Sequence, residues 1–353
     1  MSKILVTGAA GFIGFHAVEM LLKDNHEVIG LDNLNDYYDV NLKWARLKEH
    51  GIQQENVLEN ELSKSITHEK YSFLKTDIAN HDFIVAMMIE EKFDYVINLA
   101  AQAGVRYSLE NPKAYTHSNI NGFLSILEGC RHSKVKHLVY ASTSSVYGLN
   151  EAMPLNESMP TEHQISLYAA TKKANEMMAH SYAHLYQIPT TGLRFFTVYG
   201  PWGRPDMALF LFTDAILNNK PIQIFNHGKM VRDFTYVSDI AESIKRVTML
   251  PAKQNPDWSG MNPEINTSSA PYQIFNIGNS NPLELGIYID AIEKAIGKAA
   301  IKNFRELQAG DVLTTHADTS RLEKYVGFKP RTDVYKGVED FVIWYKNYYN
   351  KVN

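Results

Sequence analysis

The sequence predicts an α/β protein with a doubly wound parallel sheet and a smaller mixed α/β lobe toward the C-terminus. Two patterns support this prediction. Apolar, β-branched runs recur over the first 200 residues with helical patterns between them, and this regular alternation ends near residue 200. Strands that alternate with helices form parallel sheets covered on both faces, so the first part of the chain is expected to be one such domain.

The strands of the predicted sheet are continuous apolar segments. They cover residues 3–7, 27–31, 71–74, 94–98, 137–142 and 190–196. Continuous runs of this length are typical of strands that are buried on both faces. We therefore expect residues 1–200 to form the first domain, with a segment around 230–250 returning to it.

Beyond residue 200, shorter strands mix with helices. Strands are predicted at 222–225, 232–237 and 273–277, and helices at 207–219, 238–250, 283–296 and 335–349. This mixture predicts that residues 201–353 form mainly a second lobe, with a substrate cleft between the two lobes. Residues 251–270 are rich in Pro, Asn and Ser and are expected to form a surface loop.

Composition narrows the possible partners and the compartment. The 353 residues are 45% hydrophobic and 21% charged, which is ordinary for a globular protein. A net charge of −4 provides no electrostatic attraction to nucleic acid or to an anionic membrane, and no apolar run is long enough to cross a bilayer. The single cysteine, Cys130, cannot form an intramolecular disulfide. With no signal peptide recognised before the first strand, we expect a cytoplasmic protein.

A glycine-rich turn directly follows the first predicted strand and opens a helix. Glycine lacks a Cβ, so backbone amides can approach a diphosphate, and the helix N-terminus attracts its charge. Asp32 ends the second strand, where a carboxylate accepts ribose hydroxyls and repels a 2′-phosphate. The pattern predicts a Rossmann-like site for NAD, and the polar insertion at 48–70 is expected to cover its adenosine end as a helix and loop. The residues assigned to this part of the site are Gly8, Gly11, Phe12, Ile13, Gly14, Asp32 and Asn33.

Tyr168 and Lys172 form a second motif. Four residues apart on a helix, the two side chains lie on one face, one turn apart. A tyrosine of ordinary pKa, about 10, is a poor base at neutral pH. A neighbouring ammonium group and a cationic nicotinamide ring both favour the phenolate, so the pair predicts a tyrosine that acts as a base beside the cofactor.

With these motifs the chain resembles the extended short-chain dehydrogenase/reductase family, within it the nucleotide-sugar epimerases and dehydratases. The resemblance extends over nearly the whole chain and includes Asn98–Ala101, Ser142–Gly148 and Arg232–Phe234. It implies NAD contacts from Asp77, Ile78, Leu99, Ala100 and Ala101, with Asn119 supporting the loop beneath the cofactor. It also implies that Thr143 binds the sugar 4-hydroxyl, that Tyr168 is the base, and that Lys172 binds the nicotinamide ribose.

The family's shared first step oxidises the sugar at carbon 4, and the residues after Thr143 separate the later outcomes. The 4,6-dehydratases typically carry Thr-Asp-Glu there, and the UDP-glucuronate decarboxylases Thr-Ser-Glu. This chain has Thr143-Ser144-Ser145, with no carboxylate at either position. The resemblance therefore implies 4-epimerisation, in which the hydride returns to the opposite face of a transient 4-keto sugar.

The segment Leu193–Ala208 is similar to the signature of UDP-glucuronate 4-epimerases. UDP-glucose 4-epimerases usually carry Asn at the position of Thr197. Ser144, Ser145 and Thr197 offer hydroxyl donors for a glucuronate carboxylate, and Arg106 or Arg204 would add positive charge. For Arg106, a surface ion pair is an equally good interpretation.

The resemblance also assigns the nucleotide end of the substrate site. It implies that Arg232 binds the diphosphate, that a strand around Ile224 and Phe225 packs on the uridine, and that Gln308 and Asp311 close over the ribose and phosphate. Many epimerases carry Arg at the position of Gln308, so this contact departs from the family pattern.

Several alternatives remain open at this point. A 4-epimerase acting on UDP-glucose or UDP-N-acetylglucosamine is the main one, and a non-catalytic NAD-binding protein is another. His180 and His184 have the spacing of a zinc pair, but the chemistry needs no metal and none is expected. The resemblance implies a homodimer joined through helices at about 112–132 and 168–187, and neither nucleic acid nor a membrane is an expected partner.

Overall fold

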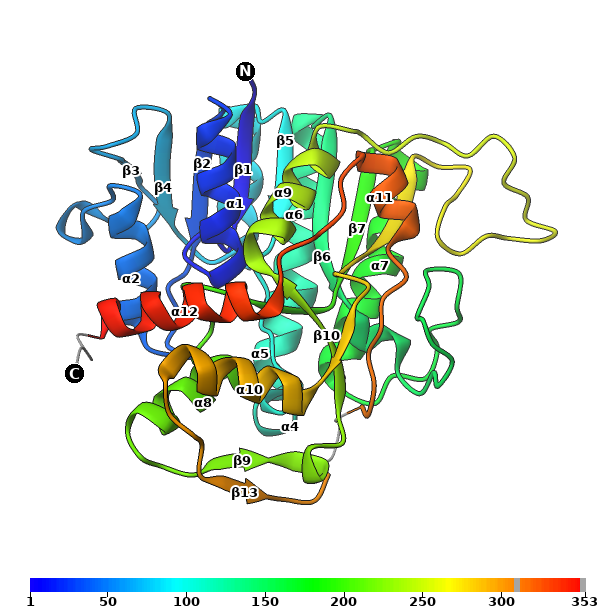
Figure 1. Cartoon of the computed structure of the whole chain (residues 1–353). Helices are drawn as coiled ribbons and strands as arrows, with labels where there is room; N and C mark the ends of the chain where they lie inside the picture. The colour runs from blue at the N-terminus through cyan, green and yellow to red at the C-terminus, as the bar shows by residue number, and fades with distance from the viewer. Residues whose placement is uncertain (308–311, 350–353) are drawn as a thin grey trace.

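The computed structural model describes residues 1–307 and 312–349 and contains a large central sheet (Figure 1). Eight strands lie in the order β11-β7-β6-β5-β1-β2-β4-β3, and every neighbouring pair is parallel except β3 with β4. Their bounds are β1 Lys3–Thr7, β2 Glu27–Asp32, β3 Leu62–Lys64, β4 Tyr71–Lys75, β5 Tyr95–Asn98, β6 His137–Thr143, β7 Thr190–Phe195 and β11 Tyr272–Ile277. This confirms the predicted Rossmann-like doubly wound sheet.

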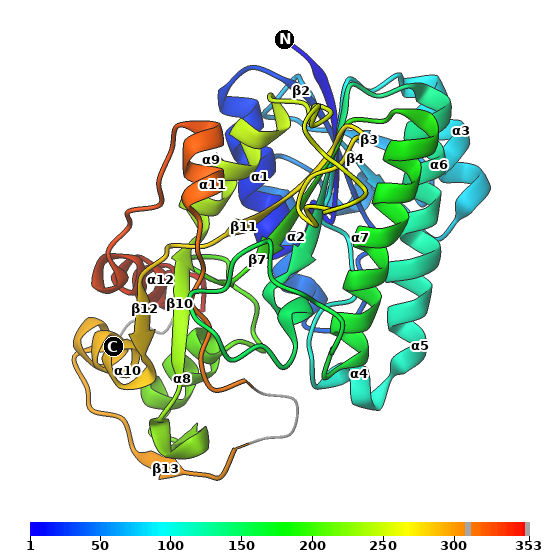
Figure 2. The same cartoon turned by 90° about the vertical axis from the view of Figure 1, so that its right-hand side faces the viewer.

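Helices cover both faces of this sheet (Figure 2). On one face α1 (Phe12–Lys23) packs against α9 (Val237–Thr248), and α11 (Ser320–Val326) packs against α9 and β11. On the other face α3 (His81–Glu91), α6 (Phe123–Ser133) and α7 (Leu167–Tyr186) lie side by side. Strands buried on both sides must be apolar throughout, which explains their continuous hydrophobic sequences.

A smaller lobe lies below the carboxyl ends of the strands, in the orientation of Figure 1. It contains a sheet of β8 (Thr197–Tyr199), β10 (Val231–Tyr236) and β12 (Pro282–Glu284), and a pair formed by β9 (Ile222–Ile224) and β13 (Lys302–Phe304). Three helices surround a separate apolar core: α8 (Ala208–Leu217), α10 (Leu285–Ile296) and α12 (Val334–Tyr348). The remaining helices and helical turns of the described residues lie elsewhere along the chain. They are α2 (Val40–Glu49), η1 (Gln54–Asn56), α4 (Tyr107–Glu110), α5 (Pro112–Tyr115), η2 (Thr116–Gly122), η3 (Ser144–Tyr147) and η4 (Phe225–Gly228).

Two segments return to the large sheet from the C-terminal part of the chain. α9 does so within the expected 230–250 segment, and β11 pairs with β7 along the edge of the sheet. Residues beyond 200 therefore contribute both a helix and a strand to the large sheet layer, so a single boundary at residue 200 does not separate the two lobes completely.

The polar insertion at 48–70 differs from its expected form. Its helix, α2, lies mostly upstream and ends at Glu49. The insertion itself contributes η1 and the edge strand β3, which runs antiparallel to β4. Only the central residue of β3, Ser63, is buried, and an edge strand with two exposed residues tolerates a polar sequence that carries no clear strand signal.

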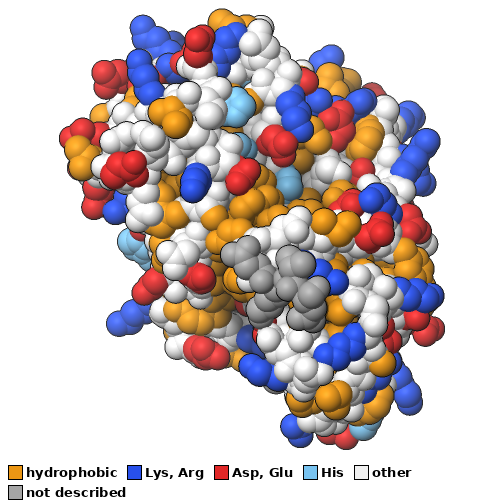
Figure 3. Space-filling view, turned by 60° about the vertical axis from the view of Figure 1, so that its left-hand side comes forward, with side chains coloured by type: hydrophobic (Ala, Val, Ile, Leu, Met, Phe, Trp, Pro, Cys, Tyr) orange, Lys and Arg blue, Asp and Glu red, His pale blue; other side chains and the backbone are white. Residues whose placement is uncertain are grey.

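The surface shows no single dominant charge on the face drawn in Figure 3, where acidic and basic side chains are interspersed. Within the described ranges, no helix combines the length and the apolar character that crossing a membrane requires. The same residues contain no group of three His, Cys, Asp or Glu side chains placed to hold a metal ion.

Candidate active site

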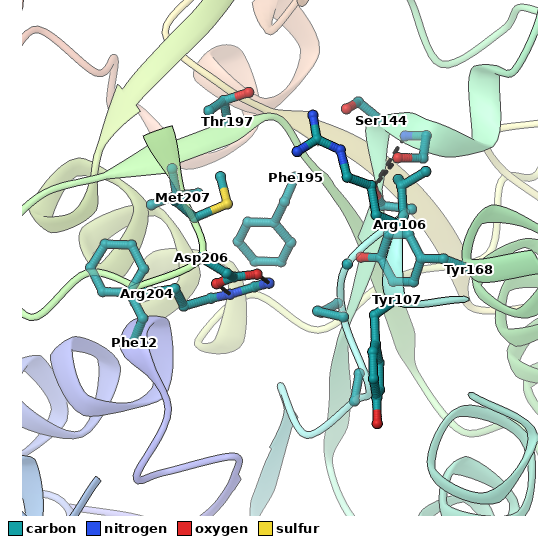
Figure 4. A pocket seen from close by; sticks show the side chains of 18 of the residues that line it. Phe12, Arg106, Tyr107, Ser144, Tyr168, Phe195, Thr197, Arg204, Asp206 and Met207 are labelled. Atoms are coloured by element: carbon teal, nitrogen blue, oxygen red, sulfur yellow. Dashed lines mark hydrogen bonds and ion pairs between the residues drawn. The ribbon is translucent and has the colours of Figure 1, made fainter. Parts of the chain in front are cut away.

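A cavity of about 1080 Å³ lies between the carboxyl ends of the strands and the smaller lobe. Ligands bind at this edge of an open parallel sheet, because the loops that follow the strands converge there. Figure 4 shows Arg204 and Asp206 close together beside Phe12, with Arg106, Tyr107 and Tyr168 across the pocket from them. The cavity extends from the glycine turn at one end to Phe225 and Arg232 at the other.

The glycine turn is packed so closely that no side chain fits. Gly8 has φ +71°, and a Cβ there would lie 2.9 Å from the Ala100 nitrogen. A Cβ on Gly14 would lie 2.0 Å from the Gly8 carbonyl oxygen. All five predicted turn residues, Gly8, Gly11, Phe12, Ile13 and Gly14, line the cavity. Because α1 begins at Phe12, its free amides face this cavity, and the turn fits a dinucleotide diphosphate.

Asp32 and Asn33 line the same end of the cavity. Asp32 Oδ1 accepts a hydrogen bond from the Leu34 amide at 2.9 Å, and Lys43 Nζ lies 3.9 Å from the same oxygen. Lys43 also donates to the Asn35 carbonyl and side-chain oxygens. The carboxylate is thus held in place at the end of β2, where it suits the hydroxyls of an adenosine ribose.

Asp77 differs from the other predicted cofactor residues. Ile78 lines the cavity, whereas the carboxylate of Asp77 accepts hydrogen bonds from Asn33 Nδ2 at 3.0 Å and from the Ala79 amide at 2.8 Å. His117 lies 3.4 Å from the same carboxylate. Asp77 is therefore placed to fix Asn33 beside the cavity, and its predicted contact with adenine stays a prediction.

The facing wall is formed by the segment after β5. Leu99, Ala100 and Ala101 line the cavity. Asn119, in η2, lies behind this wall: its side chain accepts from the Gln102 amide at 2.8 Å and donates to the Gln102 carbonyl and to Thr171 Oγ1. Asn119 thus connects the wall to α7, as expected of a residue that supports the loop.

Tyr168, Lys172 and Thr143 converge on the cavity. Burial raises the pKa of Tyr168, while a hydrogen bond with Thr143 and the charge of Arg204 oppose that rise. Burial lowers the pKa of Lys172 to about 8, against the attraction of Glu176. Thr143 is the last residue of β6, and Tyr168 lies in the first turn of α7, so the end of this strand and the start of this helix bring the two hydroxyls together.

A buried ion pair fixes α7 against the sheet directly behind Lys172. Arg194 Nε and Nη2 each donate to Glu176 at 2.9 Å, and Ser142 Oγ donates to Glu176 at 2.7 Å. Burial raises the pKa of Glu176, but the Arg194 charge and hydrogen bonds outweigh it and bring the pKa below its ordinary value. Glu176 lies one turn after Lys172, so the pair holds the helix that carries the catalytic motif.

Hydroxyl groups line the wall beyond Thr143. Ser144, Ser145 and Thr197 all border the cavity, from η3 and from the start of β8. Thr143 Oγ1 donates to Ser145 Oγ at 3.2 Å and accepts from the Ser145 amide, which fixes this turn. No acidic residue occupies the two positions after Thr143.

The two predicted arginines have different partners. Arg204 forms an ion pair with Asp206, with Nε 3.0 Å from Oδ1, and Tyr37 donates to the same carboxylate at 3.1 Å. The Arg106 guanidinium lies 5.2 Å from the centre of the Phe225 ring. Both arginines line the cavity, so both can reach a ligand, but Asp206 already balances the charge of Arg204.

The nucleotide end of the cavity is only partly described. Phe225 and Arg232 line it, and Arg232 donates to the carbonyls of Val312 and Leu313. Ile224 is buried behind the lining, in the core of the smaller lobe. Gln308 and Asp311 lie outside the described residues.

Sequence reasoning missed several polar side chains that line the cavity, among them Tyr37, Lys43 and Asp206. Asp206 had a usable signal, because it follows Arg204 by two residues within the quoted signature. Lys43 lies on α2, three residues before Arg46, and two cations at this spacing are typical of an ordinary exposed helix face.

The fold and the site together define an enzyme with a Rossmann-type dinucleotide site and a Tyr/Lys pair beside it. The model of the NAD dependent epimerase/dehydratase family matches residues 4–266. The chain belongs to this family, which confirms the resemblance to the extended short-chain dehydrogenases/reductases.

Individual relatives match the chain over its full length. Protein CapI of Staphylococcus aureus is 52% identical, with 99% of this chain and 100% of that protein covered. A probable UDP-glucuronate 4-epimerase of Rhizobium meliloti (strain 1021) is 45% identical, with 99% of each chain covered. The crystal structure of UDP-glucuronic acid 4-epimerase from Bacillus cereus, in complex with UDP-glucuronic acid and NAD, has a TM-score of 0.83 at 31% identity and covers 98% of this chain and 100% of that one.

Proposed function

We propose that this protein is an NAD-dependent isomerase that interconverts UDP-glucuronate and UDP-galacturonate by epimerisation at carbon 4. The observation that carries the proposal is the cavity wall itself. Tyr168, Lys172 and Thr143 lie together beside three further hydroxyl residues, and the two positions after Thr143 hold no carboxylate. The names of the full-length relatives support the same substrate.

NAD, when bound, takes up a hydride from the sugar and gives it back. The residues of the chain supply the proton transfer and the orientation. Tyr168 accepts the proton of the 4-hydroxyl, and Thr143 holds that oxygen by a hydrogen bond. Lys172 stabilises the Tyr168 phenolate, because a cation one helical turn away favours the charged form.

Epimerisation needs the 4-keto sugar to present its opposite face before the hydride returns. A pocket that holds the nucleotide firmly and the sugar by few contacts allows this rotation. We assign the firm contacts to Arg232 and Phe225, and to Gln308 and Asp311 as expectations. The guanidinium of Arg232 suits a diphosphate, because its fork pairs two oxygens.

The hydroxyl cluster has a protective role in this proposal. A 4-keto glucuronate is a β-keto acid, which loses carbon dioxide when its carbon–carboxylate bond aligns with the carbonyl π system. Ser144, Ser145 and Thr197 would bind the carboxylate and keep that bond near the ring plane. Arg106, which already lies in the cavity, adds positive charge for the same group.

Two incubations test the proposal. Purified protein without added cofactor receives UDP-glucuronate in one and UDP-glucose in the other, and products are separated by chromatography. We expect UDP-galacturonate from the first and no product from the second. UDP-galactose from the second incubation, with UDP-glucuronate unconverted in the first, would assign the protein to the neutral-sugar epimerases. If neither incubation gives a product, both are repeated with added NAD, and a continued absence of product would favour a non-catalytic NAD-binding protein.

We also propose a homodimer that forms through α6 and α7. The two helices pack side by side, and they expose Leu124, Met177 and Leu185 on the outer surface of the sheet layer. Light scattering after gel filtration tests this: the double variant Met177→Glu/Leu185→Glu should shift a dimer to a monomer, whereas Ile343→Glu on α12 should not.

We further propose that the protein is cytoplasmic, which the buried free thiol of Cys130 supports. Fractionation of source cells tests this location.

A further inference from the structure

Arg46 is a cation in a place where charges are seldom found. Its side chain, on α2, is fully buried. Nη1 donates to the Ala10 carbonyl at 2.8 Å and to the Tyr38 hydroxyl at 2.8 Å, and Nη2 donates to the Trp202 carbonyl at 2.6 Å. All three acceptors are neutral, and Nε has no hydrogen-bond partner.

No carboxylate pairs with Arg46 anywhere in residues 1–307 and 312–349. A buried charge without a counter-charge is costly, and proteins normally retain one only when something compensates for it. Lys43, one turn earlier on the same helix, is a second buried cation, with its Nζ 3.9 Å from Asp32. Lys43 therefore has a nearby carboxylate, whereas Arg46 donates only to neutral acceptors, so the cation that lacks an ion-pair partner on this side of the cavity is Arg46.

The position of Arg46 indicates what supplies the missing negative charge. Ala10 lies within the glycine turn, between Gly8 and Gly11, which both line the cavity. Arg46 donates to the Ala10 carbonyl, and neither of these two residues lines the cavity itself, so a dinucleotide diphosphate on the turn would be separated from the guanidinium by the peptide backbone of the turn. In a protein interior, with less screening than water, such a charge acts across one peptide layer.

We propose that Arg46 is the buried counter-charge of the cofactor's diphosphate, acting as a positioning residue through the Ala10 peptide without touching the ligand. Its hydrogen bond to the Trp202 carbonyl fixes a residue whose φ of +62° is uncommon for a large side chain. That residue precedes Arg204 and Asp206, so the same guanidinium joins the cofactor turn to the substrate wall. The proposal rests on the NAD site of the proposed function.

The test compares ligands that have a diphosphate with one that lacks it. Labelled NAD is bound to the full-length protein and displaced by unlabelled NAD, ADP-ribose or adenosine. In Arg46→Gln we expect the affinities for NAD and ADP-ribose to fall about tenfold, which is about 1.4 kcal/mol, and that for adenosine to change less than about twofold. Arg46→Lys keeps the charge with fewer donors and should stay within about threefold of wild type for all three.

Each other outcome contradicts the proposal. An equal loss for adenosine and ADP-ribose would mean that Arg46 only supports the shape of the turn. Unchanged NAD binding in Arg46→Gln, or an Arg46→Lys variant as weak as Arg46→Gln, would exclude a role for the charge. If Arg46→Gln does not fold, Arg46→Met, which also lacks the charge, takes its place with the same expected outcomes. Wild-type protein that binds no NAD would refute the proposed function itself. Arg246→Gln, on the outer helix α9, is the matched control.

Discussion

At the scale of single residues, Tyr168 carries the chemistry. Tyr168→Phe removes the hydroxyl and keeps the ring that lies 6.1 Å from the ring of Tyr115. Removal of a positioned base should lower kcat by about 10²–10⁴-fold, because the 4-hydroxyl proton then has no acceptor. Steady-state kinetics and NAD content measure this, and the NAD content should equal that of wild type. A variant that loses NAD in parallel would show that the tyrosine holds the cofactor rather than moving a proton.

Ser145 and Thr197 are predicted to prevent a side reaction. If the hydroxyls hold the sugar carboxylate, Ser145→Ala and Thr197→Ala should each weaken substrate binding by about 10–100-fold, as expected for a lost hydrogen bond to a charged group. They should also release a UDP-pentose by loss of carbon dioxide. Chromatography of the products checks both, with Ser269→Ala, an exposed position on the far loop, as the control. Unchanged affinity and no pentose would exclude this role.

Residue contacts also show the limit of what a sequence predicts. The glycine turn, Asp32 and the Tyr168/Lys172 pair were predictable, because each belongs to a local pattern with a fixed spacing. Arg204 is one of two arginines predicted to add positive charge for the sugar carboxylate, and the fold pairs it with Asp206 and brings Tyr37 to the same carboxylate. Tyr37 is 169 residues away from Asp206 in the chain, so only the closed tertiary structure brings them together.

At the scale of elements, the contact between α7 and the sheet depends on the Glu176–Arg194 pair. Glu176→Gln leaves the Arg194 guanidinium buried without a counter-charge, and breaking such a pair costs about 3–5 kcal/mol. Urea unfolding should show this loss of stability. The double variant Glu176→Leu/Arg194→Met should recover much of it, because no buried charge remains. If the double variant is as unstable as the sum of both single variants, the pair is not the cause.

Elements were predicted well where burial imposes a long pattern and poorly where it does not. The six predicted strands of the large sheet are confirmed, since two covered faces require continuous apolar runs. Three-residue strands are too short to show a period: β3, β8, β12 and β13 were missed, and of the strands of this length only β9 was predicted among the described residues. β11 was predicted as a strand, but its sequence contains no information on which sheet it joins, and it pairs with β7.

At the scale of the whole molecule, two buried histidines and one that is largely buried should make stability depend on pH. Burial lowers the pKa of His16, His50 and His137 from 6.5 to about 4 in each case. The folded protein therefore binds fewer protons than the unfolded chain between these values. The stability that each histidine contributes is complete above pH 6.5 and is lost as the pH falls toward 4, at about 1.4 kcal/mol per pH unit.

His50 allows this prediction to be tested, because neither of its ring nitrogens has a hydrogen-bond partner and its ring stacks on Phe15 at 4.5 Å. His50→Phe keeps the stacking and removes the titrating group. Unfolding free energies measured from pH 7 to pH 5, above the range in which carboxylates titrate, should fall less steeply in the variant, by about 1 kcal/mol per pH unit averaged over this range. Phe15→Leu should destabilise the protein equally at every pH, so it separates packing from protonation. If the unfolding free energy of His50→Phe falls with pH as steeply as that of the wild type, His50 has the same protonation state in the folded and unfolded protein. Its burial would then not destabilise the folded protein as the pH falls.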